Sequence, residues 1–168
     1  MAFEHVHFII NPAAGQPQPI LHTLNKVLYQ QGIAWTVSIT QDEGSGTRQA
    51  RQAVDAGADL VVAYGGDGTV KEVMNGLLDS EVPLGMLHGG TGNAMAYELG
   101  IPTDLTAATE LILRGGTLRA VDVGTVTCDD MDEPAHFMLR ASVGLQTQIV
   151  GDATRELKDQ FGNLAYVM

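Results

Sequence analysis

The sequence predicts an α/β fold in which a parallel sheet with flanking helices is followed by the start of a β-rich second domain. Three observations support this. Apolar runs alternate with helical patterns over residues 5–113. Two glycine-rich stretches, residues 65–69 and 89–93, each follow an apolar run and lead into a helical pattern. Beyond residue 116 the pattern becomes β throughout. Strands that alternate with helices imply right-handed crossovers and therefore a parallel sheet.

Each expected strand of the sheet is a short apolar or alternating run. Residues 34–40 alternate, which is typical of a half-buried strand, whereas residues 60–64 (Leu-Val-Val-Ala-Tyr) are apolar throughout, which is typical of a buried parallel strand. The four expected strands are residues 5–10, 34–40, 60–64 and 83–87.

Helices are expected where apolar residues recur three and four positions apart. The first such set is Ile20, Leu21, Leu24, Val27 and Leu28, closed by Gly32. The set directly after the first glycine-rich stretch is Val70, Val73, Met74, Leu77 and Leu78. A more polar helix is expected over residues 47–56, and another over residues 105–113. Glycines follow both of them and supply their stop signals.

We place a domain boundary near Gly116, with an α/β domain over residues 1–117 and the beginning of a β-rich domain over residues 118–168. Residues 119–127 and 136–145 are strand-like, and the acidic loop 129–133 between them predicts a hairpin with a solvated turn. A lone hairpin is not stable by itself, and the sequence stops within an apolar run. We therefore expect an N-terminal portion of a longer protein, in which the exposed edge of the incomplete β domain makes a homo-oligomer possible.

Composition excludes several classes of function. Nine basic residues against twenty acidic residues give a formal charge of −11, which argues against nucleic acid as a partner and against electrostatic docking to a membrane. No stretch is apolar enough for a membrane span, and the N-terminus lacks the pattern of a signal peptide, so a cytoplasmic location is expected. The single cysteine, Cys128, excludes an intrachain disulfide.

The two glycine-rich stretches predict phosphate binding. Backbone without Cβ atoms can approach a bulky anion closely, and the N–H groups at the start of the following helix supply donors. Asp67 would repel a phosphate unless a metal ion or an attacking hydroxyl lies between them, which is what phosphoryl transfer requires. An alternative stays open for two neighbours, because Thr69 and Glu72 also match a helix capping box.

All the suspected loops follow expected strands. Ligands of parallel α/β sheets bind at the carboxyl ends of the strands, so the loops that contain Asn11, Thr40, residues 65–71 and residues 90–93 are expected to converge on one crevice. Among the five histidines only His88, just before the second stretch, lies where a ligand could reach; a loop hydrogen bond is its alternative role.

At this point the chain resembles the diacylglycerol kinase catalytic domain family, which also includes sphingosine and ceramide kinases and bacterial lipid kinases. The resemblance rests on the order and spacing of several motifs across nearly the whole chain. These are residues 11–15 (Asn-Pro-Ala-Ala-Gly), 65–76 (beginning Gly-Gly-Asp-Gly-Thr), 83–85, 90–93 (Gly-Thr-Gly-Asn), 122–124, 141–144 and 162–166.

The resemblance implies a Rossmann-like nucleotide-binding domain of the kind shared by NAD kinases and diacylglycerol kinases. It also implies Mg²⁺-assisted transfer of the ATP γ-phosphoryl group to the hydroxyl of diacylglycerol or a related lipid in phospholipid synthesis. The lipid would be met at the inner membrane face by a peripheral protein. Asp67 is the implied catalytic carboxylate, and no metal ligand set is assigned. The implied ATP-binding residues are Asn11, Thr40, Gly65, Gly66, Asp67, Gly68, Thr69, Val70, Lys71, Glu72, Gly90, Thr91, Gly92 and Asn93.

Three departures from the family pattern concern the site. Residues 16–19 read Gln-Pro-Gln-Pro where relatives tend to have basic residues, so Lys71 is the one basic residue of the expected phosphate loops. Ala94 replaces a common aspartate, and Gln146 replaces a common acidic residue. Two other functions therefore stay open: a non-catalytic nucleotide-binding or regulatory module, and another kinase with the Gly-Gly-Asp-Gly-Thr turn, chiefly an NAD kinase.

Overall fold

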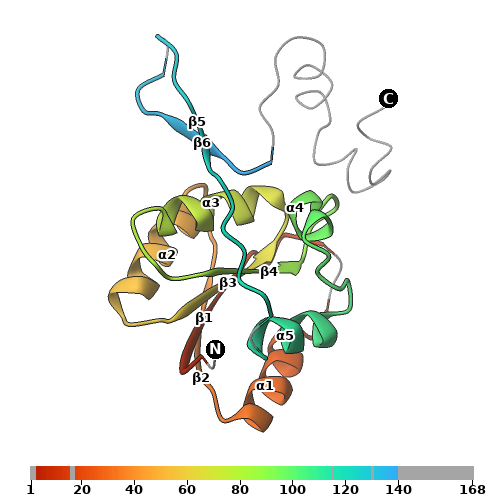
Figure 1. Ribbon diagram of the computed structural model, residues 1–168. Coiled ribbons are helices and arrows are strands. Elements are labelled where there is room, and N and C mark those ends of the chain that lie inside the picture. Colours follow the sequence, from red (N-terminus) through yellow and green to blue (C-terminus); the bar gives the residue numbers. More distant parts are fainter. Residues whose placement is uncertain (1–2, 16–17, 115, 130, 140–168) are drawn as a thin grey trace. The chain divides into compact units, whose positions relative to one another are not determined.

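The computed structural model describes residues 3–15, 18–114, 116–129 and 131–139. The chain divides into two compact units, residues 1–121 and residues 122–168, and each is described by itself. The first unit is the predicted α/β layer structure, a parallel sheet with helices on both faces (Figure 1).

The sheet of the first unit contains four parallel strands in the order β2-β1-β3-β4. They are β1 (His5–Ile10), β2 (Ala34–Ile39), β3 (Leu60–Gly65) and β4 (Leu84–His88). All six residues of the central strand β3 are buried, which explains its continuous apolar sequence. The register pairs Ile10 with both Ile39 and Tyr64, and Gly65 with His88. All four strands therefore end at one edge of the sheet.

Helices cover both faces of this sheet. They are α1 (Ile20–Gln31), α2 (Ser45–Asp55), α3 (Asp67–Leu77), α4 (Ala94–Glu98) and α5 (Leu105–Leu113). Helices α2 and α3 pack together on one face, and α1 and α5 pack together on the other (Figure 1). The side chains that fill the α1/α5 layer include Phe8, Leu24, Tyr64 and Leu87. As predicted, α1 ends at Gly32, which adopts the left-handed conformation with φ 66°.

Two helix boundaries differ from the sequence prediction. Helix α2 begins at Ser45, two residues before the predicted start, because the buried Ser45 hydroxyl closes a turn with Asp42. Helix α3 begins at Asp67, so the turn before it is reduced to Gly66. Helix α4 is the helical pattern expected after the second glycine-rich stretch; its bounds were not predicted, since five residues are too few to show a helical period.

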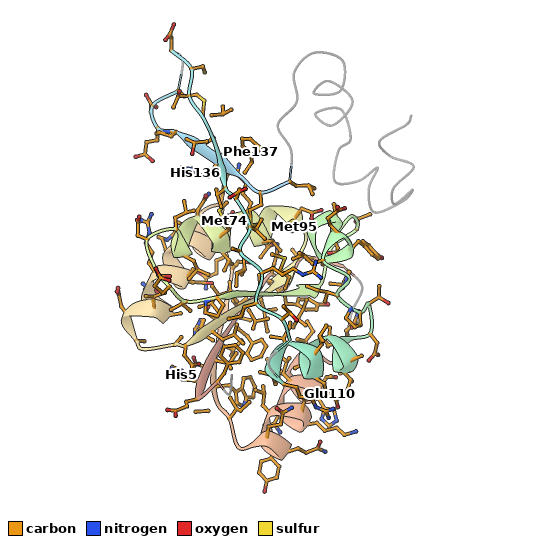
Figure 2. The ribbon with its side chains drawn as sticks, in the orientation of Figure 1. His5, Met74, Met95, Glu110, His136 and Phe137 are labelled. Atoms are coloured by element: carbon orange, nitrogen blue, oxygen red, sulfur yellow. The ribbon has the colours of Figure 1, made fainter. Side chains whose placement is uncertain are left out.

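The described part of the second unit is a short antiparallel hairpin. Strand β5 (Gly124–Val126) pairs with β6 (Ala135–Phe137), which confirms the predicted hairpin with shorter strands. The Phe137 ring, labelled in Figure 2, packs over Gly124 directly opposite; a Cβ there would lie 2.4 Å from Cζ of that ring. The rest of the second predicted strand, residues 140–145, lies outside the described residues.

A chain of hydrogen bonds runs across β1 and β2 to α2. The Gln49 amide donates to the Ile39 carbonyl at 2.8 Å, so its oxygen accepts from the Ser38 hydroxyl at 3.0 Å. Ser38 must then accept from His7 Nε2 at 2.9 Å, which leaves Nδ1 to accept from Thr36 at 2.7 Å. This order of donors is the one that a neutral His7 imidazole makes, because both ring nitrogens donate in the charged form.

Stability is expected to fall when the solution is acidified through the ordinary pKa of histidine, about 6.5. Burial lowers the pKa of His7, and the neighbouring His5 lowers it further. Below pH 6.5 the unfolded chain therefore binds this proton more readily than the folded chain, so the stabilisation is complete above that pH and is lost below it. Thermal unfolding between pH 7.5 and 5.5 measures the effect. The variant His7→Gln is expected to show a smaller loss of Tm; an equal loss would contradict this origin.

Candidate functional site

Asn11 links the loop after β1 to the start of α3. Its N–H donates to the Tyr64 carbonyl at 2.9 Å, which continues the pairing of β1 with β3 by one residue. Its side-chain Nδ2 donates to the Thr69 hydroxyl at 3.1 Å, and its Oδ1 accepts from the Ala13 N–H at 3.0 Å. The predicted convergence of the first and third loops is therefore present in the structure.

The capping-box interpretation of Thr69 and Glu72 is wrong. The residue at the cap position of α3 is Gly66, which makes no side-chain capping bond. Thr69 is the third residue of α3, is 7% exposed and accepts a bond from Asn11. The Glu72 carboxylate accepts from the Gly46 N–H of α2 at 2.9 Å. The first-turn N–H groups of α3 are thus left without a side-chain cap of their own.

The two glycine-rich loops are packed backbone against backbone. A Cβ on Gly90 would lie 2.4 Å from the Gly66 Cα, and a Cβ on Gly89 would lie 2.7 Å from the Gly65 nitrogen. The Gly89 N–H also donates to the Gly65 carbonyl at 3.1 Å. Much of the glycine content therefore serves the close approach of the loops to each other, a requirement that the sequence pattern did not reveal.

Gly68 differs from these glycines. It is exposed in the first turn of α3, and no atom of another part of the described structure would lie within 4 Å of a Cβ placed on it. The position is open to the N-terminus of the helix, where free N–H groups and the helix dipole favour an anion. Exposed first-turn positions of this kind are where helix N-termini commonly bind phosphate in proteins.

Asp67 lies between the two loops. It is the first residue of α3 and half-buried, and its Oδ1 accepts from the Met95 N–H at 3.2 Å. A Cβ on Gly92 would lie 3.1 Å from its Oδ2, so that the start of α4 borders one carboxylate oxygen and the second loop borders the other. Met95, labelled in Figure 2, is buried beyond the second loop. The carboxylate is therefore positioned by the Met95 N–H and lies one residue before the exposed Gly68.

The second loop is closed by Asn93. Its Oδ1 accepts from the Gly90 N–H at 2.8 Å, and its Nδ2 donates to the Gly90 carbonyl at 2.6 Å. With φ 48° Asn93 is the single residue other than glycine with a positive φ in the described part of the chain. Thr91 at the tip of this loop is exposed. Buried Asn93 thus shapes the loop, and Thr91 is accessible.

The remaining predicted residues differ in their accessibility. Thr40 directly follows β2, and its N–H donates to the Ile10 carbonyl at 2.9 Å beside Asn11. Lys71 is exposed on α3. Val70 is 5% exposed and packs in the core, so only its backbone, which donates to the Gly66 carbonyl at 3.1 Å, belongs to the loop.

His88 has the loop role that its alternative interpretation predicted. Its Nε2 lies 2.9 Å from the Ile101 carbonyl and must donate to it, and the Tyr97 ring packs edge-on against it at 4.8 Å. This bond joins the end of β4 to the segment after α4. Tyr64, below the same loop, is 1% exposed, and burial raises the pKa of its hydroxyl, which therefore stays protonated.

A cavity of about 500 Å³ adjoins the site on the α1 side. Its lining is mainly apolar and combines the ends of β1 and β2 with the start of α1. Asn11 belongs both to this lining and to the link with Thr69. Its size is typical of small-molecule pockets.

No group of three or more histidine, cysteine, aspartate or glutamate side chains among the described residues is arranged to hold a metal ion. No helix in that part of the chain is long and apolar enough to cross a membrane.

Comparisons with known proteins agree with one another. The diacylglycerol kinase catalytic domain family matches residues 5–126. A diacylglycerol kinase of Bacillus subtilis is 33% identical over 98% of this chain and 54% of its own length. An uncharacterized protein of Synechocystis is 36% identical over 96% of this chain and 38% of its own. A protein of Klebsiella pneumoniae named "Probable lipid kinase YegS-like" is 31% identical over 92% of this chain and 50% of its own.

A crystal structure of a diacylglycerol kinase from Bacillus anthracis is similar in fold, with a TM-score of 0.58 and 31% identity. The similarity covers 75% of this chain and 45% of the chain in that crystal structure. The chain thus spans about half the length of several relatives that it matches. Because the family match extends over most of the chain and includes both glycine-rich loops, the chain belongs to the diacylglycerol kinase catalytic domain family.

Proposed function

We propose that the protein is a lipid kinase, which transfers the γ-phosphoryl group of ATP to the hydroxyl of diacylglycerol or a related lipid. The observation that carries this proposal is the position of Asp67, a carboxylate at the first residue of α3, between two glycine-rich loops and beside the open Gly68. Relatives named diacylglycerol kinase and lipid kinase support the choice of acceptor.

The phosphates of ATP are assigned to the N-terminal turn of α3 and the second loop. Backbone N–H groups of the first turn supply donors, and exposed Lys71 supplies a positive charge. Thr91, at the exposed tip of the second loop, supplies a hydroxyl. Asn11 orders Thr69 next to these groups, and Thr40 lies at the adjoining strand end. Gly66, Gly90 and Gly92 allow the loops to approach each other, and Gly65 leaves room for the Thr69 side chain.

Mg²⁺ fits the Asp67 carboxylate. In phosphoryl-transfer sites this ion is held by one or two carboxylates together with phosphate oxygens, so a full protein cage is not required. When bound, Mg²⁺ would neutralise part of the negative charge of the phosphates. The described residues offer Asp67 for this purpose at the crevice.

In the proposed reaction the lipid hydroxyl oxygen forms a bond to the γ-phosphorus, and the bond from that phosphorus to the β–γ bridging oxygen breaks, so that ADP leaves. The hydroxyl proton is transferred to Asp67. Met95 holds Oδ1 through its N–H, which leaves Oδ2 as the oxygen that accepts the proton. The Met95 N–H at the start of α4 orients this carboxylate, and Gly92 of the second loop leaves room beside its Oδ2.

The lipid would be reached at a membrane surface by peripheral contact, with residues 1–117 binding ATP and the domain that begins at residue 118 binding lipid. The formal charge of −11 disfavours electrostatic attraction to anionic headgroups, so apolar contact is the expected mode of attachment.

The test is a transfer assay of the intact protein with labelled ATP, Mg²⁺ and a panel of acceptors. We expect label in vesicle-borne diacylglycerol or a related lipid, and none without Mg²⁺. Label in NAD would overturn the assignment of acceptor in favour of an NAD kinase. ATP binding measured by calorimetry without transfer to any acceptor would instead establish a non-catalytic module.

A further inference from the structure

A contact between α2 and α3 joins the loop after β2 to the phosphate loop. Gly46, the second residue of α2, donates its N–H to the Glu72 Oε2 at 2.9 Å. The next residue, Thr47, donates its hydroxyl to the Glu72 carbonyl at 2.8 Å. A carboxylate of one helix thus caps the N-terminus of another, since Gly44 at the cap position of α2 makes no side-chain capping bond.

Glycines make this contact possible. A Cβ on Gly46 would lie 2.8 Å from the Glu72 Cβ, and a Cβ on Gly76, one turn further along α3, would lie 2.5 Å from the Thr47 carbonyl oxygen. The same added Cβ on Gly76 would lie 2.6 Å from the Ala50 Cβ. Positions four apart on each helix therefore form a close-packed interface. Its polar centre is Glu72.

Further hydrogen bonds hold the loop between β2 and α2 at its β2 end. The Thr40 N–H donates to the Ile10 carbonyl at 2.9 Å. The Ser45 hydroxyl, 3% exposed, accepts from the N–H groups of Gln41 at 3.1 Å and Asp42 at 2.9 Å. Thr40 is therefore connected to α3 through a short rigid segment that ends at the Gly46–Glu72 bond.

We propose that Glu72 is a positioning residue, which holds the loop of Thr40 in register with the phosphate loop at the start of α3. This inference rests on the proposed function, because Thr40 and the α3 turn are both assigned there to ATP. In this role Glu72 acts through the Gly46 N–H as a hydrogen-bond acceptor. An amide oxygen can replace a carboxylate oxygen in that role, whereas a methyl group cannot.

The variants Glu72→Ala and Glu72→Gln separate positioning from direct charge. In the intact protein we expect Glu72→Ala to raise KM for ATP about tenfold and to change kcat less, since bound ATP is then held by a misplaced loop. The KM of Glu72→Gln is expected to stay within about twofold of the wild-type value, because the bond to Gly46 needs only an acceptor oxygen. Glu81→Ala, which removes an exposed glutamate outside the site, is the matched control.

A reciprocal variant tests the same contact from α2. Gly46→Ala forces the two helices apart at Glu72 and is expected to raise KM as Glu72→Ala does, with no further rise in the double variant. If Glu72→Ala does not fold, Thr47→Val, which removes one hydroxyl bond at nearly constant shape, is expected to raise KM about twofold to threefold.

Three results would overturn the inference. One is an unchanged KM in folded Glu72→Ala; another is a Glu72→Gln variant as impaired as Glu72→Ala, which would show that the charge itself acts on the nucleotide. The third is hydrogen exchange of the Gly46 amide that is no faster in Glu72→Ala than in the wild type. Exchange does not depend on ATP, so it still tests the contact if the wild type fails to bind ATP and the proposed function falls.

Discussion

Replacing Asp67 by asparagine in the intact protein is expected to lower kcat by about 10²–10⁴-fold, the contribution typical of a positioned acid or base. Asparagine keeps the oxygen that accepts from the Met95 N–H, so the link between α3 and α4 is retained. Its Nδ2 can neither accept the proton of the lipid hydroxyl nor hold Mg²⁺. The steady-state rate of lipid phosphorylation measures the loss.

The control for Asp67→Asn is stability. Because the bond to Met95 survives, the free energy of unfolding is expected to change by no more than about 0.5 kcal/mol, as for ordinary surface substitutions. A denaturant titration of wild type and variant checks this. Retained turnover in the folded variant would remove Asp67 from the catalytic role. A large loss of stability would show instead that its charge is needed for the fold.

Gly68→Ala and Gly90→Ala are expected to have opposite effects. At Gly68 a Cβ meets no other part of the described structure, and alanine is favoured in a helix by about 1 kcal/mol, so stability is expected to stay equal or rise. The added methyl group occupies the space assigned to phosphate. We therefore expect ATP affinity to fall about tenfold or more, equivalent to about 1.4 kcal/mol.

At Gly90 the new methyl group would lie 2.4 Å from the Gly66 Cα, and backbone cannot move aside as a flexible side chain does. The expected cost is about 1–3 kcal/mol of stability, typical of an overpacked interior. Calorimetry with Mg-ATP and thermal unfolding of both variants make the comparison. Unchanged ATP affinity in Gly68→Ala would place the phosphates away from the α3 turn, and an undamaged Gly90→Ala would contradict the contact between the loops.

The sequence alone determined the order and type of most elements. Strands β1, β2, β3 and β4 occur within one residue of their predicted ends, and α5 spans the predicted residues. These elements are recognisable because their signals are local: alternation or continuous burial in strands, a 3.6-residue period in helices, and glycine after the last turn. The convergence of the strand-end loops also followed from the sequence, because parallel strands end at one edge of a sheet.

The contacts between the loops were decided by tertiary structure. The identity of Glu72 could not show that its carboxylate caps α2 rather than α3, because Gly46 is remote in sequence and lies against Glu72 only after the two helices pack. The same holds for Asp67 and Met95, and for Gly66 and Gly90. Local sequence patterns predict a loop of the phosphate-binding type. They do not predict which backbone groups hold its carboxylate, because those contacts form only when distant segments pack together.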